Sequence, residues 1–426
     1  MLPTRKTLPP QLAIAVRTSP VSAVVRPPGS KSLTNRALVT ASLSKGVSRL
    51  SDPLEADDSE AMREGLVGLG VSIDDVDDPW LVLGTGGELA APVGPLDARE
   101  AGTVARFLTA VAALCPGPVT IDGRGRMRER PMEELVASLT GLGVGVEHRD
   151  GKLPLTVRGG RLRGGRVEVD PSRSSQFVSA LLLIAPMAEG EMEIVMTADP
   201  VSRPYLTSTI EVMAAFGANV EDREDRFLIS GNGYRATDYE IEADASAAAY
   251  PLVAAAISAG RVVIDGIPRS SSQPDVALLD VLAAMGCTVH RTDRHVELAG
   301  PPGALRAVDV DMRHAPDASL VLAVACLFAD GESRIRGLGN LRHKESDRLT
   351  ALHTELVRVG GSARIEGDDL LVGPGQLRPA VVETYNDHRM AMSFALVGLR
   401  QPGIVIDSPS CVSKTWPSYF SVLSRL

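Results

Sequence analysis

The chain has 426 residues, more than a single hydrophobic core usually serves, so its length predicts two or three domains. Its formal net charge of −9 at pH 7 disfavours nonspecific binding to nucleic acid or to an anionic membrane surface. An anionic small molecule remains a possible ligand, because basic residues gathered at one place decide whether it binds.

Neither a membrane span nor a secretory signal is evident in the sequence. No apolar stretch reaches membrane-spanning length without a polar interruption, and residues 1–16 lack the long apolar run of a signal peptide. We therefore expect a cytoplasmic protein. The four cysteines show no paired spacing, which favours buried, reduced thiols over disulfides. They are Cys115, Cys287, Cys326 and Cys411.

In chain order, a strand-like stretch, LAIAV (12–16), precedes six copies of one pattern. Each copy has a small or hydroxylic helix start, an apolar helix, a break that contains glycine and a short β-rich run. The copies begin about 70 residues apart, at Ser30, Ala101, Ser172, Asp244, Pro316 and Asn386. Because helix starts present free N–H groups and a positive dipole end, several of them directed at one place would bind an anion.

A second element alternates with the first. Each copy reads as a helix end, a glycine, a strand, an acidic turn and another strand. The clear copies begin at Leu66, Leu139, Met213, Leu282 and Leu356. The repeating unit is therefore β-α-β-β-α-β, with the N-terminal strand and the C-terminal tail (417–426) expected to supply the pieces of the sixth copy.

Six units divide most simply into three and three, which predicts an α/β fold of two similar domains. The first lobe would span 23–240 and hold repeats 1–3. The second would combine 1–22 with 241–426 and hold repeats 4–6, so that each lobe has about 200 residues. The chain would then cross between the lobes twice, as at a hinge.

The first repeat opens with RPPGSKSLTNRAL from Arg26. Its turn offers backbone donors, the Ser32 hydroxyl and the Lys31 charge, and Arg36 lies one helical turn further on, where it can bind a carboxylate or phosphate. A capped surface helix is the alternative interpretation. The spacing differs from GxxxxGK[ST], which disfavours a nucleotide P-loop.

The second and third repeats add further helix starts of the same kind. Gly102 brings backbone without a side chain to a helix start, and the loop GRGRMRERP follows with four arginines, of which we expect one or two to reach a ligand. Serine clusters begin the next two helices and suit a phosphate monoester, although each alone is a common helix cap. These segments are SRSSQF, with Ser174, Ser175 and Gln176, and VSRPYL, with Ser202, Arg203 and Tyr205.

The second half contributes mixed charges at three helix starts. The segment NLRHKESDRL reads by default as a salt-bridged helix face. The segment YNDHRMAM is different, because its charged residues directly precede an apolar helix. Burial of that helix would place these charges at an interface, where they need partners. The candidate residues here are Asp317, Asn340, Lys344, Glu345, Arg348, Asp387, His388, Arg389 and Lys414.

The seven histidines are scattered without the spacing of metal ligands, and neither a GxSxG elbow nor a dinucleotide fingerprint is present. We therefore expect no metal site and no cofactor.

In nine segments, taken in order over nearly its whole length, the chain resembles the 5-enolpyruvylshikimate-3-phosphate synthase family: PGSKSLTNRAL, AGTVARF, RMRERP, SSQF, SRPY, PDAS, NLRHKESDRL, YNDHRMA and SKTWP. The resemblance implies two inside-out α/β barrel domains of three βαββαβ repeats, with the active site in the cleft between them. It also implies transfer of the enolpyruvyl group of phosphoenolpyruvate to the 5-hydroxyl of shikimate 3-phosphate, with release of phosphate and closure of the cleft around the substrates.

The resemblance assigns two sets of residues to the substrates. The set for shikimate 3-phosphate is Lys31, Ser32, Arg36, Ser174, Ser175, Gln176, Ser202, Tyr205, Asp317, Asn340 and Lys344. The set for phosphoenolpyruvate is Lys31, Gly102, Arg126, Gln176, Glu345, Arg348, His388, Arg389 and Lys414. Addition and elimination both require a positioned acid and base. We hypothesise that Asp317 takes the hydroxyl proton and that Glu345, with Lys31, transfers the methylene proton.

Two residues depart from the family pattern. Glu100 stands where many relatives have asparagine, and Phe107 where others have proline. These departures leave local details of the phosphoenolpyruvate pocket open, including its response to the inhibitor glyphosate, which the intact Ala101-Gly102 step otherwise implies. A bulkier residue at Gly102 is expected to exclude that inhibitor.

Three alternatives stay open at this point. A related enolpyruvyl transferase that acts on UDP-N-acetylglucosamine carries a reactive cysteine in the loop before the Arg-Pro pair, where this chain has no thiol. A noncatalytic protein could capture the same anions, but it would not need carboxylates such as Asp317 and Glu345. A nucleotide-using enzyme is disfavoured by the absent P-loop. The expected partners are small anionic substrates, without nucleic acid or membrane, and the expected state is a monomer.

Overall fold

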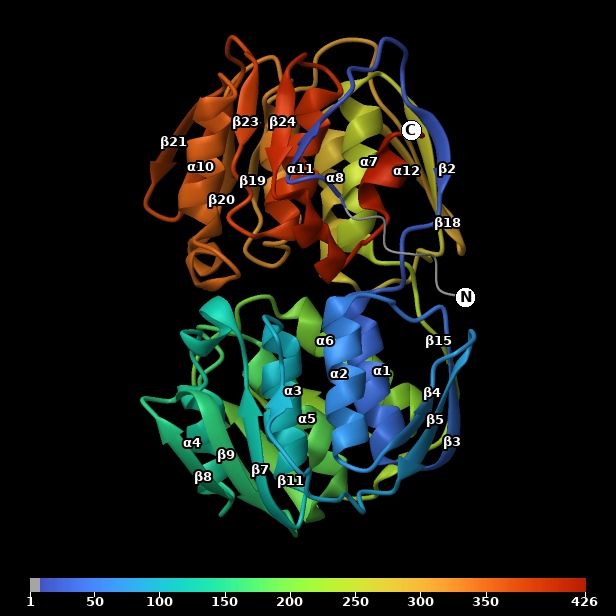
Figure 1. Cartoon of the computed structure of the whole chain (residues 1–426), viewed down its shortest axis with the longest axis vertical. Coiled ribbons are helices and arrows are strands. Elements are labelled where there is room, and N and C mark those ends of the chain that lie inside the picture. The colour runs from blue at the N-terminus through green and yellow to red at the C-terminus, as the bar shows by residue number, and fades with distance from the viewer. Residues whose placement is uncertain (1–7) are drawn as a thin grey trace. The chain divides into compact units, whose positions relative to one another are not determined.

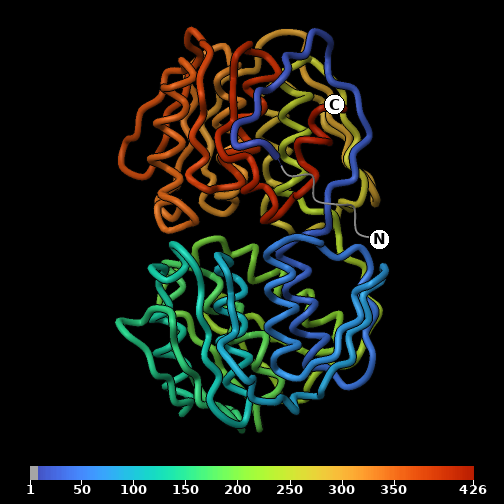
Figure 2. The backbone as a smooth tube through the Cα atoms, in the orientation of Figure 1, coloured from blue at the N-terminus to red at the C-terminus, as the bar shows by residue number. Residues whose placement is uncertain are grey.

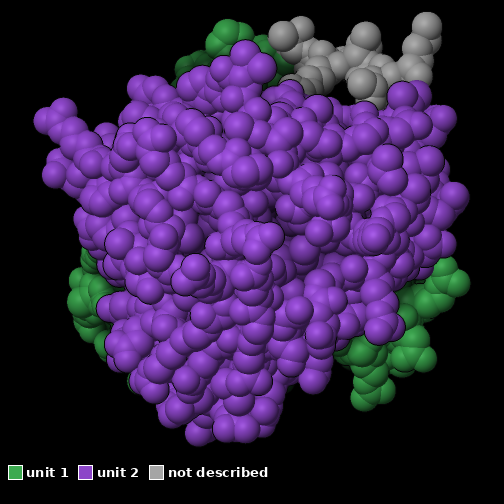
Figure 3. Space-filling view, turned by 90° about the horizontal axis from the view of Figure 1, so that it is seen from below, with its two compact units in different colours: residues 1–28, 242–426 green, residues 29–241 purple. Residues whose placement is uncertain are grey.

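The computed structural model describes residues 8–426, which form two compact units. Unit 1 contains the described residues up to 28 together with 242–426, and unit 2 contains 29–241, as Figure 3 distinguishes by colour. Residues 1–7, which the sequence assigns to the second lobe, lie outside the described residues.

The first crossing lies after residue 28, whereas the sequence places it after residue 22. The reason is strand pairing: β2 (Ser22–Val25) pairs in parallel with β16 (Arg261–Asp265), with Ser22 opposite Arg261. These hydrogen bonds keep the strand with unit 1, and Figure 2 shows the blue N-terminal segment running along the yellow to red part of the chain.

In unit 2, the first helix of each repeat lies in the interior and the second lies further out (Figure 1). The interior helices contact one another and are buried on nearly all faces. They are α1 (Lys31–Leu43), α3 (Gly102–Ala112) and α5 (Gln176–Ile184). The outer helices are α2 (Asp57–Gly68), α4 (Glu133–Gly141) and α6 (Pro204–Ala215).

Three separate sheets of the same topology cover these helices. In each, a parallel pair is followed by an antiparallel hairpin. The first is β14 (Tyr234–Arg235) and β15 (Asp238–Glu240), then β3 (Ser44–Ser51), β5 (Trp80–Thr85) and β4 (Ser72–Asp74). The second is β6 (Leu96–Asp97), β7 (Gly117–Asp122), β9 (Lys152–Gly159) and β8 (Gly145–Arg149). The third is β10 (Arg163–Val169), β11 (Glu189–Met196), β13 (Arg226–Ile229) and β12 (Val220–Arg223).

Unit 1 repeats this plan in two of its three sheets, and in the third a single N-terminal strand takes the place of the hairpin. The sheets are β2, β16, β18 (His295–Ala299) and β17 (Thr288–Arg291); β19 (Asp309–Asp311), β20 (Ser333–Arg336), β22 (Asp369–Gly373) and β21 (Ser362–Glu366); and β1 (Gln11–Ala13), β24 (Ile404–Asp407) and β23 (Ala380–Val382). Strand β1 places Leu12 opposite Ile406, so the sequence correctly predicts that the N-terminal strand packs onto the second half.

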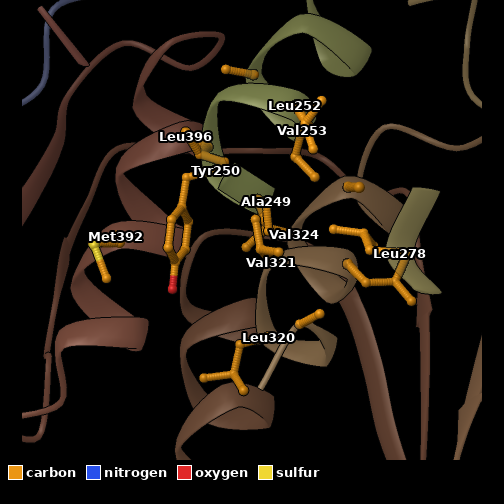
Figure 4. Close-up of a cluster of buried hydrophobic side chains, with 14 of the residues drawn as sticks. Ala249, Tyr250, Leu252, Val253, Leu278, Leu320, Val321, Val324, Met392 and Leu396 are labelled. Atoms are coloured by element: carbon orange, nitrogen blue, oxygen red, sulfur yellow. The ribbon is translucent and has the colours of Figure 1, made fainter. Parts of the chain in front are cut away.

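The helices of unit 1 follow the same division, and each unit has its own hydrophobic core. The interior helices are α7 (Ala245–Ile257), α9 (Ser319–Cys326) and α11 (His388–Gly398). The others are α8 (Leu278–Ala284), α10 (Arg348–Arg358) and α12 (Tyr419–Leu423). Figure 4 shows Tyr250, Leu320 and Met392, one from each interior helix, within this core.

Short 3₁₀ turns occur between these elements: η1 (Gly125–Arg128), η2 (Ala185–Met187), η3 (Pro274–Ala277), η4 (Gly339–His343) and η5 (Pro409–Lys414). The α/β class and the three-repeat organisation of each half are confirmed. Within residues 8–426, every helix is too short or too polar to cross a membrane.

Candidate active site

In unit 2, Arg36 joins the starts of two helices that the family resemblance assigns to shikimate 3-phosphate. Its Nη1 donates to Ser32 Oγ at 2.6 Å and to Ser32 O at 3.0 Å, and its Nε donates to Thr209 Oγ1 at 2.8 Å. Its Nη2 donates to Ser179 Oγ and to Tyr205 O, both at 3.2 Å. The structure thus brings together Ser32, Arg36 and Tyr205, three of the predicted residues.

The charge of Arg36 is buried among neutral acceptors. The side chain is 2% exposed, and its burial lowers the pKa of Arg36 to about 10. Because five N–H groups already donate to protein oxygens, binding of a ligand carboxylate by Arg36 requires the exchange of one of these bonds.

Lys31, at the first position of α1, faces a carboxylate that no sequence motif marks. Its Nζ lies 3.3 Å from Asp58 Oδ2, and both side chains are largely buried. Asp58 belongs to the first turn of α2, which also contains Asp57 and Glu60. Acidic residues at a helix start are common for electrostatic reasons, so sequence position alone does not indicate that Asp58 faces Lys31.

Gln176, the first residue of α5, is held by a second buried arginine that the sequence did not single out. Arg106 Nη1 donates to Gln176 Oε1 at 2.5 Å, and Arg106 Nη2 donates to Pro131 O at 3.0 Å. The guanidinium carbon lies 4.9 Å from the centroid of the Phe177 ring. Because arginine only donates hydrogen bonds, it fixes the amide oxygen of Gln176 toward itself and leaves the amide NH₂ group for another partner.

The four arginines of the loop before α4 have different surroundings. Arg124 pairs with Asp97, and Arg128 pairs with Asp122 at 2.6 Å, both at the surface. Arg126, the residue assigned by resemblance, is partly buried in η1. Arg130 is the most buried of the four, at 7% exposure.

Arg130 lies directly against the start of α3. A Cβ atom placed on Gly102 would lie 2.7 Å from Arg130 Nη1 and 2.8 Å from both Arg130 Cζ and Nη2. Gly102 therefore does begin a helix with bare backbone, as the sequence indicates, but the group next to that backbone is a guanidinium.

The serines of the phosphate-type motifs lie at the starts of α5 and α6. Ser175 is buried at the N-cap position of α5, and Ser174 Oγ accepts from Gln176 N at 3.3 Å. Ser202 is buried and has a φ of 58°, a left-handed conformation that is uncommon for serine and often marks a functional position. Arg203, in the same motif, instead pairs with Asp222 at 2.5 Å.

In unit 1, Asp317 is the centre of a cluster of cations. Its Oδ1 accepts from Arg348 Nη1 at 2.9 Å, its Oδ2 lies 2.9 Å from Arg389 Nη2, and Lys344 Nζ lies 3.7 Å from Oδ1. Burial acts to raise the pKa of Asp317, but the neighbouring cations, Arg389 first, outweigh it and hold that pKa below its ordinary value. The carboxyl group is therefore ionised in this arrangement.

Glu345 lies between two cations of the predicted set, Arg348, which also contacts Asp317, and Lys414. Its Oε2 is 2.9 Å from Arg348 Nη2, and its Oε1 is 3.7 Å from Lys414 Nζ. Lys414 ends η5 and is buried. The structure thus links Asp317, Lys344, Glu345, Arg348, Arg389 and Lys414 by direct contacts, although these residues come from four different segments.

Asp387, a residue of the YNDHRMA motif, accepts hydrogen bonds from two residues of this cluster, Arg348 and Arg389. Its carboxylate accepts from Arg348 Nε at 2.7 Å and Nη2 at 3.1 Å, and it caps α11 by accepting from Arg389 N at 2.9 Å. His388, which follows it, is fully buried, with Nδ1 3.7 Å from Asp387 Oδ1. Asn340, in η4, is partly buried, and its Oδ1 accepts no hydrogen bond from residues 8–426.

A further buried carboxyl group, Asp275, lies in the same electrostatic neighbourhood. Ser246 Oγ donates to Asp275 Oδ2 at 2.6 Å, and within the described part of the chain Oδ1 accepts nothing. Burial first, and then the negative charge of Asp317, raise the pKa of Asp275 to about 6. Asp275 could not be predicted from the sequence, because a single aspartate in a proline-containing turn carries no chemical signal.

Comparisons with known proteins agree on one family. The model of the EPSP synthase (3-phosphoshikimate 1-carboxyvinyltransferase) family matches residues 16–423. A 3-phosphoshikimate 1-carboxyvinyltransferase of Erwinia tasmaniensis is 43% identical over 421 residues, covering 95% of this chain and 96% of that protein. One of Trichormus variabilis is 40% identical over 418 residues, covering 96% and 97%.

Solved structures show the same fold at lower identity. An EPSP synthase from Acinetobacter baumannii superposes with a TM-score of 0.82 at 24% identity, over 97% of this chain and 98% of that one. The enolpyruvyl transferase NikO from Streptomyces tendae superposes with a TM-score of 0.78 at 18% identity, over 98% and 97%.

Proposed function

The chain belongs to the EPSP synthase (3-phosphoshikimate 1-carboxyvinyltransferase) family, and on this basis we propose that it transfers the enolpyruvyl group of phosphoenolpyruvate to the 5-hydroxyl of shikimate 3-phosphate. Phosphate is the second product. The observation that carries the proposal is the buried cluster of unit 1, in which four cations surround two carboxylates. Capture of anions needs only the cations, whereas proton transfer also needs the carboxylates.

The reaction proceeds by addition and then elimination. The 5-hydroxyl oxygen forms a bond to the phosphate-bearing carbon of phosphoenolpyruvate while the methylene carbon gains a proton, which gives a tetrahedral adduct. The adduct then loses phosphate and one methyl proton, and this restores the double bond. Both steps move protons at carbon or oxygen, and neither step needs an oxidant or a reductant.

Asp317 is proposed to accept the hydroxyl proton in the addition. The carboxylate of Asp317 is ionised and can therefore accept a proton. The cations that lower its pKa also make it a weaker base. Substrate anions that bind Arg348 and Arg389 would draw these charges away from the carboxylate and raise its basicity. Binding and activation of the base are therefore coupled in this account.

Glu345 is proposed to transfer the methylene proton, assisted by Lys31 as the family resemblance implies. Its two oxygens lie against Arg348 and Lys414, so that the carboxylate is held in one orientation by cations on both sides. The cations of the cluster are proposed to bind the phosphoenolpyruvate anions and to stabilise the charge that develops as phosphate leaves.

The serines and Gln176 of unit 2 are proposed to bind the 3-phosphate and the ring of shikimate 3-phosphate, and Gln176 is proposed to contact phosphoenolpyruvate as well. Ser174 and Ser175 lie at the start of α5, and Ser202 precedes α6, so hydroxyl groups and helix N-termini supply neutral donors to a phosphate. The left-handed backbone of Ser202 supports a functional reading of that residue.

Phosphate release tests the proposed substrates. We expect release with phosphoenolpyruvate and shikimate 3-phosphate together and none when UDP-N-acetylglucosamine replaces shikimate 3-phosphate. The reverse result would favour the related transferase, and the absence of release with either acceptor would favour a noncatalytic binding protein. The loop 124–131 carries Met127 and no cysteine, which supports the first outcome.

We also propose that the protein acts in the cytoplasm as a monomer, without nucleic-acid or membrane partners. The net charge of −9 supports the last two points, because it opposes association with polyanions. Light scattering coupled to size exclusion at micromolar concentration tests the monomer, and a mass of two chains would overturn it.

A further inference from the structure

The turn that leads into α11 has an unusual backbone. Tyr385 and Asn386 both have a φ of 54°, in the left-handed region. Asp387 N donates to Thr384 O at 2.8 Å, so these two residues are the central pair of a four-residue turn, 384–387. Positive φ at both central positions is the pattern of a type I′ turn, which glycine, asparagine and aspartate dominate. Asn386 suits this conformation, whereas a bulky tyrosine at position 385 is unfavourable there.

A buried carboxylate holds the tyrosine of this turn. The Tyr385 hydroxyl donates to Glu355 Oε1 at 3.0 Å, and Glu383 N donates to Glu355 Oε2 at 3.2 Å. Burial first, and then the hydrogen bond to Glu355, raise the pKa of Tyr385 to about 12, so the hydroxyl keeps its proton at neutral pH and acts as the donor. Both oxygens of the Glu355 side chain therefore accept from the segment 383–385.

Glu355 is fully buried on α10, which is unfavourable for a carboxyl group unless its hydrogen bonds offset the loss of water. Burial raises the pKa of Glu355, and the bonds from Tyr385, Arg358 and Glu383 N act against that rise. Arg358 is itself 44% exposed, so solvent weakens its attraction to the carboxylate. The directional bonds to the turn are what a carboxylate supplies at this place and an apolar side chain would not.

One face of α10 contacts the turn at two points. Arg348 and Glu355 lie seven positions apart on this helix, which is two helical turns, so both side chains project from the same face. Arg348 donates to Asp387 at 2.7 and 3.1 Å, and Glu355 accepts from Tyr385. The helix therefore holds the turn on both sides of Asn386.

The turn also sets the start of α11. Asp387 is the N-cap of this helix and accepts from Arg389 N at 2.9 Å, and Arg389 Nη2 lies 2.9 Å from Asp317 Oδ2. A change of backbone conformation at 385 or 386 would shift Asp387 and Arg389 together. Groups that position substrates are sensitive to displacements of about 1 Å, so such a shift would weaken the cluster as a binding site.

We propose that Glu355 is a positioning residue, which holds the turn 384–387 through its hydrogen bond from Tyr385. The left-handed conformation held in this way places Asp387 and Arg389 in the cluster of unit 1. This inference rests on the proposed function, in which Arg389 binds phosphoenolpyruvate. Glu355 and Tyr385 are not among the residues that the family resemblance assigns, and they act through the turn without touching a substrate.

The test compares Tyr385→Phe and Glu355→Gln with Tyr234→Phe as the matched control. Tyr385→Phe removes the hydroxyl and keeps the ring, and we expect it to raise the KM for phosphoenolpyruvate by about tenfold or more, as loss of a hydrogen bond to a charged group predicts. The KM for shikimate 3-phosphate should change less than about threefold. Tyr234→Phe also removes a buried hydroxyl, which donates to Leu183 O at 2.9 Å in unit 2, and should change neither KM.

The variant Glu355→Gln should act in the same direction, because its amide offers one acceptor oxygen to two donors. If Glu355 and Tyr385 act as one device, the double variant Tyr385→Phe/Glu355→Gln should be no worse than the more severe single variant. Effects of the two substitutions that multiply would overturn the inference.

Two further variants at position 385 test the left-handed backbone. Tyr385→Ala and Tyr385→Gly both remove the ring and the hydroxyl, but glycine alone adopts a positive φ without a steric penalty. The KM for phosphoenolpyruvate should therefore be at least about threefold lower in Tyr385→Gly than in Tyr385→Ala. A direct contact between the tyrosine and a substrate would be lost equally in both.

Amide hydrogen exchange of the peptide 383–391 gives a readout apart from turnover, because Asp387 N donates to Thr384 O within the turn. Exchange of this peptide should be faster in Tyr385→Phe than in the wild type and unchanged in Tyr234→Phe. An unchanged KM for phosphoenolpyruvate in Tyr385→Phe, or equal values in Tyr385→Gly and Tyr385→Ala, would overturn the inference.

The two proposals fail in distinguishable ways. If the wild-type protein releases no phosphate, the proposed function fails. Faster exchange of the peptide 383–391 in Tyr385→Phe would then still support the hold of Glu355 on the turn, and unchanged exchange would overturn it.

Discussion

Arg348 and Asp387 are joined by two hydrogen bonds in the interior of unit 1, from Nε to Oδ2 at 2.7 Å and from Nη2 to Oδ1 at 3.1 Å. Their side chains are 1% and 0% exposed. Asp387 also accepts from the backbone N–H of Arg389. The Asp387 carboxylate therefore orients Arg348 and caps α11, the helix that carries Arg389. Asp387 is not itself proposed to contact substrate.

Asp387→Asn should lower both stability and activity. The substitution keeps the size of the side chain but removes its charge, which leaves Arg348 with less compensation in a buried place. We expect the free energy of unfolding to fall by about 3 kcal/mol and kcat/KM to fall by about 10²-fold. Urea unfolding and initial rates measure these quantities.

Asp309→Asn is the matched control, because Asp309 pairs with Arg336 at the surface, where both side chains are about half exposed. This variant should change the unfolding free energy by less than about 1 kcal/mol. Equal effects of the two substitutions on the unfolding free energy would show that the buried Arg348–Asp387 pair stabilises the protein no more than a surface pair does.

Gln176→Glu should weaken substrate binding without unfolding the protein. A glutamate can still accept from Arg106 Nη1, so the melting temperature should change little. Its second oxygen would present negative charge where the amide now presents N–H donors, and the KM for phosphoenolpyruvate should rise about tenfold or more. Steady-state kinetics with Gln376→Glu, an exposed position, as the control measures the effect. An unchanged KM would mean that the amide does not face the substrate.

Asp317→Asn and Glu345→Gln test the assigned proton transfers. Each variant keeps the shape of the side chain and removes its ability to accept a proton, so turnover should fall by about 10²-fold or more in each. Single-turnover measurements at saturating substrate separate this effect from binding. The assignment is wrong if both variants keep wild-type turnover.

Asp275 should make stability depend on pH. Burial raises its pKa from 3.8 to about 6, so the folded state binds this proton more tightly than the unfolded state does. Its contribution to the free energy of unfolding therefore falls as pH rises from about 4 to about 6 and stays low above that range. Asp275→Asn should consequently stabilise the protein by about 2 kcal/mol more at pH 7.5 than at pH 4.5.

Urea unfolding at the two pH values tests this prediction. Asp280→Asn serves as the control, because Asp280 is exposed on α8 and should show no such difference. A stabilisation by Asp275→Asn of the same size at both pH values would contradict a raised pKa for this group.

The fold was largely predictable from the sequence because its signals are local. Apolar helices, glycine breaks and alternating strands recur within each repeat, and α1, α3 and α7 begin one residue after the predicted starts Ser30, Ala101 and Asp244. The place of the N-terminal strand could also be predicted, since the sixth repeat lacks one piece. The exact crossing between the units could not, because the pairing of β2 with β16 is set by contacts distant in sequence.

The candidate site was only partly predictable for the same reason. Motifs mark the residues that begin helices, but the partners that orient them come from elsewhere: Arg106 lies 70 positions from Gln176, and Asp387 lies 39 from Arg348. Spacing also cannot tell which arginine of the loop 124–130 is buried. The resemblance selects Arg126 in this loop, whereas the structure buries Arg130 against the start of α3.

The most direct measurement is the reaction of the wild-type protein in D₂O with phosphoenolpyruvate and shikimate 3-phosphate, and with each omitted in turn. We expect phosphate release only when both are present, with one phosphate for each enolpyruvyl ether formed. We also expect deuterium in the methylene group of that ether, because protonation and deprotonation occur at that carbon. Phosphate release from phosphoenolpyruvate alone, or none with both substrates, would contradict the proposed function.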